Sequence, residues 1–129
     1  MINTRRLFKR FLIILFLYFF VSELYDSFAV VGLASWYGGK DQGDLTANGE
    51  IYDMYRYSAA HRRLPFGTMV KVTRLSNKRS VIVRINDRGP YVPGRIIDLS
   101  MAAAGELGMV NKGLARVKIE IVGQGKGAL

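Results

Sequence analysis

Short segments in which apolar and polar residues alternate, separated by glycine-rich turns, occupy most of the sequence after residue 29. The clearest runs from Ala115 to Ile121, where every second residue is apolar and the residues between them are charged. Side chains of a strand point alternately to its two faces, so this pattern predicts a strand at residues 114–122 with one buried face. Four further segments are predicted strands: residues 30–37, 69–75, 80–86 and 95–99. Five or six short strands predict a small closed barrel, because closure leaves no unpaired strand edge.

One short helix is predicted among these strands. Ser100 is a favourable N-cap for the alanine-rich residues 101–107, and Gly108 is suited to end the helix. Residues 76–78 are predicted to form a hairpin turn. The sequence thus predicts an all-β domain with one or two short helices at residues 30–122, followed by a disordered tail at residues 123–129 that has little to bury.

The first 29 residues have a different character. Four basic residues between positions 5 and 10 precede an uncharged apolar run at residues 11–21. A membrane-spanning helix needs about 20 apolar residues, whereas the apolar core of a signal peptide is shorter. Ser27 and Ala29 are small residues at the −3 and −1 positions, so we expect residues 1–29 to be a signal peptide that is cleaved after Ala29. An uncleaved membrane anchor is the alternative, and both place the barrel in the periplasm or cell envelope.

The formal net charge of the chain is +9, and residues 30–129 keep 15 Lys and Arg against 8 Asp and Glu. A basic surface suits an acidic partner, and export argues against nucleic acid as that partner. Cysteine is absent, which excludes a disulfide framework, a Cys-ligated zinc site and a thiol nucleophile. His61 is the single histidine of the sequence, which excludes a multi-histidine metal site. We expect a monomer that needs neither metal nor cofactor.

Three residues are candidates for chemistry. Glu50 ends the turn at residues 46–50, and Asp87 follows the strand at residues 80–86 and opens a strong turn signal, Asp-Arg-Gly-Pro. A carboxylate at the point where a strand becomes a loop is well placed to meet a substrate. His61 is the third candidate. Each of the three also has an ordinary structural reading, since Asp caps turns and a histidine often packs in the interior.

Short motifs occur in a fixed order along the barrel sequence: ASWYG (34–38), TANGE (46–50), AAH (59–61), LPFGT (64–68), VRINDRGP (83–90), GRIIDLS (94–100) and the alanine-rich stretch to LGM (102–109). Together they resemble the rare lipoprotein A family of septal lytic transglycosylases, across residues 33 to 122. The resemblance implies a six-stranded double-psi β-barrel. It also implies an enzyme that cleaves the MurNAc–GlcNAc strands of peptidoglycan in cell-wall remodelling and septation, with a preference for peptide-free glycan.

In a lytic transglycosylase the C6 hydroxyl of muramic acid attacks its own anomeric carbon and leaves a 1,6-anhydro end. The resemblance implies that Asp87 is the catalytic aspartate, which protonates the leaving oxygen and then accepts the hydroxyl proton. Glu50 and His61 match the other functionally important positions of the family. Glu50 is expected to stabilise positive charge on the sugar or to polarise the attacking hydroxyl, and His61 to orient a carboxylate or to hold the substrate.

Five residues are expected to contact the substrate: Trp36, Tyr37, Thr46, Asn48 and Arg88. Of Trp36 and Tyr37, we expect at least one to be a core residue and the other to offer its face to a sugar ring. Arg88 and Arg95 could each pair with a carboxylate of the substrate or with Asp98. Asp98 lies between two apolar residues and is expected to be structural.

Residues 41–45 depart from the family pattern, in which a Phe-His-Gly-Arg-like stretch is common before the TANGE turn. Here the stretch reads DQGDL, and its two acids are expected to weaken the binding of anionic sugar groups. Two other functions therefore stay open. One is a non-catalytic, expansin-like module that binds peptidoglycan or loosens the wall, because one fold serves several functions. The other is an inverting glycan hydrolase, which needs two carboxyl groups about 6.5–9.5 Å apart.

Overall fold

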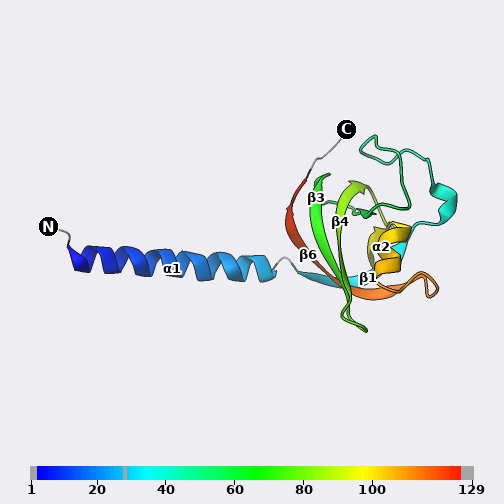
Figure 1. The fold of residues 1–129 in the computed structure, drawn as a ribbon. Coiled ribbons are helices and arrows are strands. Elements are labelled where there is room, and N and C mark those ends of the chain that lie inside the picture. Colours follow the sequence, from blue (N-terminus) through cyan, green and yellow to red (C-terminus); the bar gives the residue numbers. More distant parts are fainter. Residues whose placement is uncertain (1–2, 28, 126–129) are drawn as a thin grey trace.

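The structure is a computed structural model that describes residues 3–27 and 29–125. Helix α1 (Thr4–Ser27) extends away from a barrel of six strands (Figure 1). Its side chains between Phe11 and Phe20 are exposed. Within the described ranges, no helix has the length and apolar character needed to span a bilayer. The predicted signal peptide covers α1 and Ala29, and its cleavage motif includes Phe28, which lies outside the described residues.

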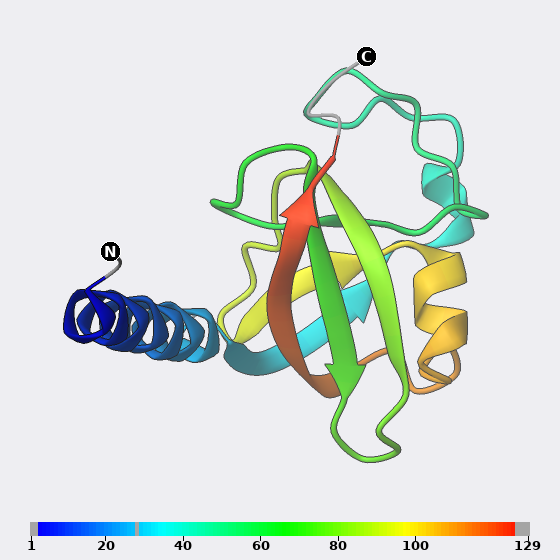
Figure 2. The same cartoon turned by 60° about the vertical axis from the view of Figure 1, so that its left-hand side comes forward.

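Six strands form the closed barrel that the sequence predicted: β1 (Val30–Trp36), β2 (Ser58–Ala60), β3 (Thr68–Arg74), β4 (Ser80–Asp87), β5 (Arg95–Leu99) and β6 (Ala115–Gln124). Their order around the barrel is β1-β5-β2-β4-β3-β6, and β6 pairs with β1 to close it. The pairs β1/β5 and β2/β4 are parallel, and the other neighbouring strands are antiparallel. Figure 2 shows the strands wrapped around one interior.

The interior is filled by the alternate apolar residues of these strands. Val70, Val72, Val83, Ile85 and Val117 are completely buried. Branched side chains fit a half-buried pleated strand well, and full burial of each stabilises the fold by roughly 1.5–3 kcal/mol. The predicted periodicity of β3, β4 and β6 is therefore confirmed.

Close contact between β1 and β5 depends on Gly32. A Cβ atom at this position would lie 2.6 Å from the side chain of Ile96, so a larger residue would require the Ile96 side chain or the strand to shift. At the end of this pair, the Tyr37 N–H donates a 2.8 Å hydrogen bond to the Leu99 carbonyl. The chain therefore leaves β1 at a fixed point beside β5, and this fixes the start of the long loop over one end of the barrel.

Helix α2 (Met101–Glu106) begins as predicted, because the Ser100 hydroxyl accepts a hydrogen bond from the Ala103 N–H. Gly108 follows it with a φ of 68°, a conformation that glycine adopts without strain. The predicted hairpin joins β3 to β4, with the Arg74 N–H bonded to the Arg79 carbonyl at 2.8 Å. The same Arg74 donates from its guanidinium to the Leu107 and Gly108 carbonyls, so the hairpin satisfies carbonyl groups at the end of α2.

Strand β2 was not predicted from the sequence, and β6 continues beyond its predicted end at residue 122. Strand β2 is only three residues long, with two alanines that are completely buried between β4 and β5. Gly123 and Gln124 continue β6 and pair with Met69 and Thr68, so the predicted disordered tail was wrong for these two residues. Residues 126–129 of that tail lie outside the described residues.

Candidate functional site

The loop of residues 37–57 lies over the end of the barrel at which β4 ends (Figures 1 and 2). It begins with a short 3-10 helix, η1 (Gly39–Asp41), and narrows where Leu45 and Ile51 form an isolated antiparallel bridge. Between these two residues lies the TANGE turn. The loop therefore carries one candidate carboxylate, Glu50, to the end of the strand that carries the other, Asp87.

The turn is built by its own polar residues. The Thr46 N–H donates a 2.7 Å hydrogen bond to the Glu50 carbonyl, and the Thr46 hydroxyl donates to Oδ1 of Asn48 at 2.6 Å. The Glu50 N–H also donates to this Asn48 oxygen, at 3.1 Å. Gly49 has a φ of 89°, which completes the turn. Thr46 and Asn48, expected to contact substrate, thus use these polar groups to shape the loop.

Glu50 is buried beside β4. Its carboxylate pairs with the guanidinium of Arg84 and accepts a 3.3 Å hydrogen bond from the Asn86 side chain. The Arg84 guanidinium holds the pKa of the Glu50 carboxyl below its usual value. Glu50 is therefore a fixed negative charge at neutral pH and is poorly suited to donate a proton.

Asp87 has a different environment. Its Oδ1 accepts hydrogen bonds from the backbone N–H groups of Ala47, at 2.9 Å, and Arg88, at 2.8 Å. Its Oδ2 accepts a 2.8 Å hydrogen bond from the Tyr37 hydroxyl. All three of these donors are neutral groups, whereas Glu50 is bound to a guanidinium. The two carboxylates are therefore suited to different tasks, with Asp87 the better candidate for moving a proton.

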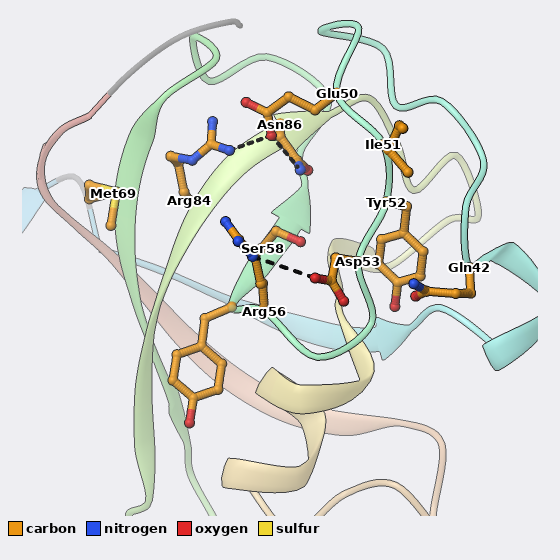
Figure 3. A pocket seen from close by; sticks show the side chains of 11 residues that line it. Gln42, Glu50, Ile51, Tyr52, Asp53, Arg56, Ser58, Met69, Arg84 and Asn86 are labelled. Carbon is orange, nitrogen blue, oxygen red and sulfur yellow. Dashed lines mark hydrogen bonds and ion pairs between the residues drawn. The ribbon is translucent and has the colours of Figure 1, made fainter.

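Glu50 and Asp87 open into two neighbouring hollows that share Tyr52. The larger, of about 610 Å³, is lined by Glu50, Arg84 and Asn86 together with side chains of the loop (Figure 3). The smaller, of about 400 Å³, is lined by Asp87 and by Tyr37, Lys40, Asp41, Asp44, Leu45 and Thr46. Tyr52 lines both. The structure thus brings the two predicted acids to adjoining parts of one face.

The imidazole of His61 does not line either of these hollows. It lies in a third, smaller one, among apolar residues of β1, β3 and β6. Its Nδ1 accepts hydrogen bonds from the Arg63 and Leu64 N–H groups, both at 3.0 Å. Burial, followed by the positive charge of Arg62, lowers the pKa of His61. The link from His61 to Asp87 runs through the backbone, where the His61 N–H donates to the Asp87 carbonyl at 3.2 Å.

Arg88 holds the loop that follows β2 and contains His61. Its guanidinium donates to the His61 and Leu64 carbonyls, at 3.2 and 2.9 Å, and lies 3.8 Å from the centre of the Phe66 ring. Asp98 instead accepts a 3.1 Å hydrogen bond from the Ser35 hydroxyl, and burial raises the pKa of its carboxyl. The suggested pairing of Arg88 with Asp98 is therefore wrong, because the guanidinium is committed to loop carbonyls and to an aromatic ring.

Trp36 and Tyr37 take different positions. Trp36 is half-buried and packs against the core cluster. Tyr37 leaves the barrel, and its ring centre lies 4.8 Å from that of Tyr52 at an angle of 55°. One of the two is thus a core-packing residue as expected. Tyr37 reaches Asp87 through its hydroxyl, a contact that the sequence did not predict.

Three further residues of this face were not predicted from the sequence: Arg84, Asn86 and Tyr52. Arg84 and Asn86 alternate with the core residues of β4, so they lie on the strand's other side, facing the loop. That alternation near the end of a strand was an available signal. No periodic pattern marks Tyr52, because it belongs to an irregular loop.

The chain was compared with known proteins, and it matches one family. The family described as "Lytic transglycolase" matches residues 29–119. The Vibrio cholerae protein named endolytic peptidoglycan transglycosylase RlpA is 57% identical over 95 residues, which cover 74% of this chain and 36% of that protein. The Pseudomonas aeruginosa protein of the same name is 56% identical over 94 residues, covering 73% of this chain and 28% of that protein.

Among solved structures, the apo expansin of Clavibacter michiganensis superposes with a TM-score of 0.60 at 25% identity, covering 77% of this chain and 52% of that one. The present chain spans 36% and 28% of the length of the two relatives, and the match falls on the barrel. The family match covers β1 to β5 completely and the first half of β6. The chain therefore belongs to the rare lipoprotein A family of double-psi β-barrel proteins, as its motifs predicted.

Proposed function

We propose that this chain is an endolytic peptidoglycan lytic transglycosylase that cuts between MurNAc and GlcNAc and leaves 1,6-anhydro-muramyl ends. The observation that carries the proposal is the position of Asp87, half-buried and oriented by three hydrogen bonds at the rim of an open hollow. The names of relatives that are more than half identical over the barrel support the same activity.

In the proposed reaction, Asp87 gives its proton to the glycosidic oxygen as the bond from this oxygen to the anomeric carbon breaks. The C6 hydroxyl oxygen of the same muramic acid then bonds to that carbon, and its proton passes to the Asp87 carboxylate. The atoms balance without water, and Asp87 returns to its starting state. One residue that acts first as acid and then as base suffices for this sequence.

The proposed role of Glu50 is to stabilise charge. The transition state of glycoside cleavage carries positive charge on the sugar ring, and a fixed carboxylate in the neighbouring hollow favours it. Arg84 and Asn86 hold this carboxylate in place. A glycan strand lying across both hollows would pass Tyr52, whose position between them supports an extended substrate.

We further propose that the substrate is peptide-free glycan and that the protein acts in the periplasm or cell envelope during wall remodelling and septation. The basic barrel and the candidate signal peptide at residues 1–29 support this location. Sequencing the N-terminus of the protein recovered from cell envelopes tests the signal peptide. A chain that begins at Val30 supports cleavage, and one that retains residues 1–29 supports the anchor.

An expansin-like module that binds glycan without cutting it is the second candidate function. The structural similarity to an expansin favours it, as do Asp41 and Asp44 in the hollow beside Asp87. A third possibility, inverting hydrolysis, would leave reducing ends.

Product analysis separates these functions. The full chain, kept in detergent because of its apolar N-terminal segment, is incubated with purified sacculi and with amidase-stripped glycan, and the products are identified by mass spectrometry. Anhydro-muramyl ends support the transglycosylase. Binding without new ends supports the expansin-like module, and new reducing ends support a hydrolase; either of these results contradicts the proposed reaction.

A further inference from the structure

The two oxygens of the Asp87 carboxylate are not equivalent. Each carboxylate oxygen has two lone pairs that accept hydrogen bonds. Oδ1 already accepts two, from the Ala47 and Arg88 backbone N–H groups. Among the residues that the structure describes, Oδ2 accepts one hydrogen bond, from the Tyr37 hydroxyl. A proton added to Asp87 must therefore reside on Oδ2, because protonation of Oδ1 would displace a backbone hydrogen bond.

Tyr37 is rigidly placed to meet this oxygen. Its backbone N–H is bonded to the Leu99 carbonyl, and its ring packs against that of the buried Tyr52. Burial, and then the Asp87 carboxylate, raise the pKa of the Tyr37 phenol far above its usual value. The phenol therefore stays protonated and remains a hydrogen-bond donor at neutral pH.

We propose that Tyr37 is a positioning residue for Asp87, which aims Oδ2 at the scissile oxygen and holds the carboxylate in place through its hydroxyl. A hydroxyl donor bonds more strongly to a carboxylate than to a carboxylic acid. It therefore favours the state that Asp87 reaches after it has given its proton to the leaving group. The catalytic part of this inference rests on the proposed function. The hydrogen bond between Tyr37 and Asp87, and its effect on the titration of Asp87, can be tested without it.

Other charged groups face Asp87, and the proposed test leaves them unchanged. Lys40, Asp41 and Asp44 line the same hollow, and Asp98 on β5 interacts electrostatically with Asp87. The Arg88 guanidinium is held by the loop carbonyls and by the Phe66 ring. Replacing Tyr37 by Phe removes one oxygen atom and alters none of these groups, so a change in the titration reports the lost hydroxyl.

The test is an NMR titration of the Asp87 carboxyl in the full chain, in detergent, for the unmodified protein, Tyr37→Phe and Tyr52→Phe. We expect the titration midpoint to rise by about one pH unit in Tyr37→Phe, because the variant loses the hydroxyl that donates to the charged form of the carboxyl. Tyr52→Phe is the matched control, because the Tyr52 hydroxyl bonds to the Met101 N–H and its loss should leave the midpoint in place.

A second variant keeps the test valid if Tyr37→Phe does not fold. Incorporation of 3-fluorotyrosine at position 37 keeps the hydroxyl and makes it a stronger donor, so the midpoint should fall. In the pH–rate profile for anhydro-muramyl release, the alkaline limb should move in the same direction as each midpoint, whereas a merely structural role would lower the rate equally at every pH. Unchanged midpoints in both variants would overturn the inference. Absence of product from the unmodified chain would overturn the proposed function alone, because the NMR titration needs no activity.

Discussion

The Ala47 N–H donates a 2.9 Å hydrogen bond to Oδ1 of Asp87, which joins the loop after β1 to the end of β4 at the candidate acid. One residue further on, the Asn48 N–H donates to the Asn86 carbonyl. Two adjacent residues of the TANGE turn thus bind two adjacent residues of the strand. The position of the Asp87 carboxylate is set largely by backbone groups, so substitutions of nearby side chains should change its environment more than its place.

Replacing Arg84 by Met should destabilise the protein, because the buried Glu50 carboxylate loses its positive partner. We expect the free energy of unfolding to fall by about 2–3 kcal/mol, measured by urea denaturation. Arg56→Met is the matched control: Arg56 pairs with Asp53 at 3.5 Å on the surface, where such a pair contributes about 1 kcal/mol or less. Adding Glu50→Gln to Arg84→Met should recover part of the loss. Equal effects of the two arginine substitutions would contradict the importance of the buried pair.

Two substitutions of His61 distinguish the roles of its two ring nitrogens, because each replaces only one of them with an amide group. Asn places its Oδ1 where Nδ1 of His61 accepts the Arg63 and Leu64 N–H groups, whereas Gln extends an amide toward the position of Nε2. If His61 acts by closing this turn, His61→Asn should keep most of the activity and stability. His61→Gln should lose about 1–2 kcal/mol of stability with its acceptor. Both variants are compared in activity assays and by urea denaturation. Greater activity and stability in His61→Gln than in His61→Asn would assign the function to Nε2.

Stability should depend on pH through His61. Its pKa is lowered in the folded protein, mainly by burial, so between the folded and unfolded pKa values the unfolded chain binds more protons. The contribution is therefore complete above the unfolded value of about 6.5 and is lost as the pH falls through the folded value. Urea denaturation between pH 8 and pH 5 should show stability falling toward acid, by about 1.4 kcal/mol per pH unit at most. The His61→Asn variant should show a smaller fall, and an identical fall would refute this assignment.

Asp44 lies in the same hollow as Asp87, where family members commonly carry basic and aromatic residues nearby. The lactyl groups of peptide-free glycan are carboxylates, so removing this acid should tighten binding. We expect Asp44→Asn to lower the Kd for amidase-stripped glycan by about 1.4- to 5-fold at low salt, the range that one partly exposed charge supplies. Glu120→Gln on β6 makes the same change in net charge away from this hollow and should have little effect. Equal gains from both would point to net charge alone.

The barrel was predictable because most of its strands alternate strictly. In β3, β4 and β6 most inward residues are valine or isoleucine and most outward residues are polar, so period and burial agree. Strand β2 was not predictable in this way, because its serine and two alanines are buried on both faces and show no alternation. Gly123 and Gln124 have low strand propensity and are held in β6 by their pairing with β3, which is a tertiary effect.

The candidate site was predictable only in part, because its contacts also depend on the tertiary structure. The positions of Glu50 and Asp87 followed from turn and strand-end signals, supported by the motifs. Their different environments depend on Arg84, which is 34 residues from Glu50, and on Tyr37, which is 50 residues from Asp87. Contacts between residues so far apart in the sequence follow from the barrel topology, and no local sequence pattern indicates them. The commitment of Arg88 to the loop carbonyls is likewise a consequence of the folded loop.

The most direct test of the central claim is to compare the unmodified chain with Asp87→Asn on amidase-stripped glycan. The amide keeps the shape of the side chain and can still accept the backbone N–H hydrogen bonds, but it can neither donate nor take up the catalytic proton. We expect anhydro-muramyl ends from the unmodified chain and at least a hundredfold less from Asp87→Asn, in line with the roughly 10²–10⁴-fold contribution of general acid–base catalysis. Circular dichroism and the Tm should show that the variant remains folded. Full activity in Asp87→Asn would contradict the account.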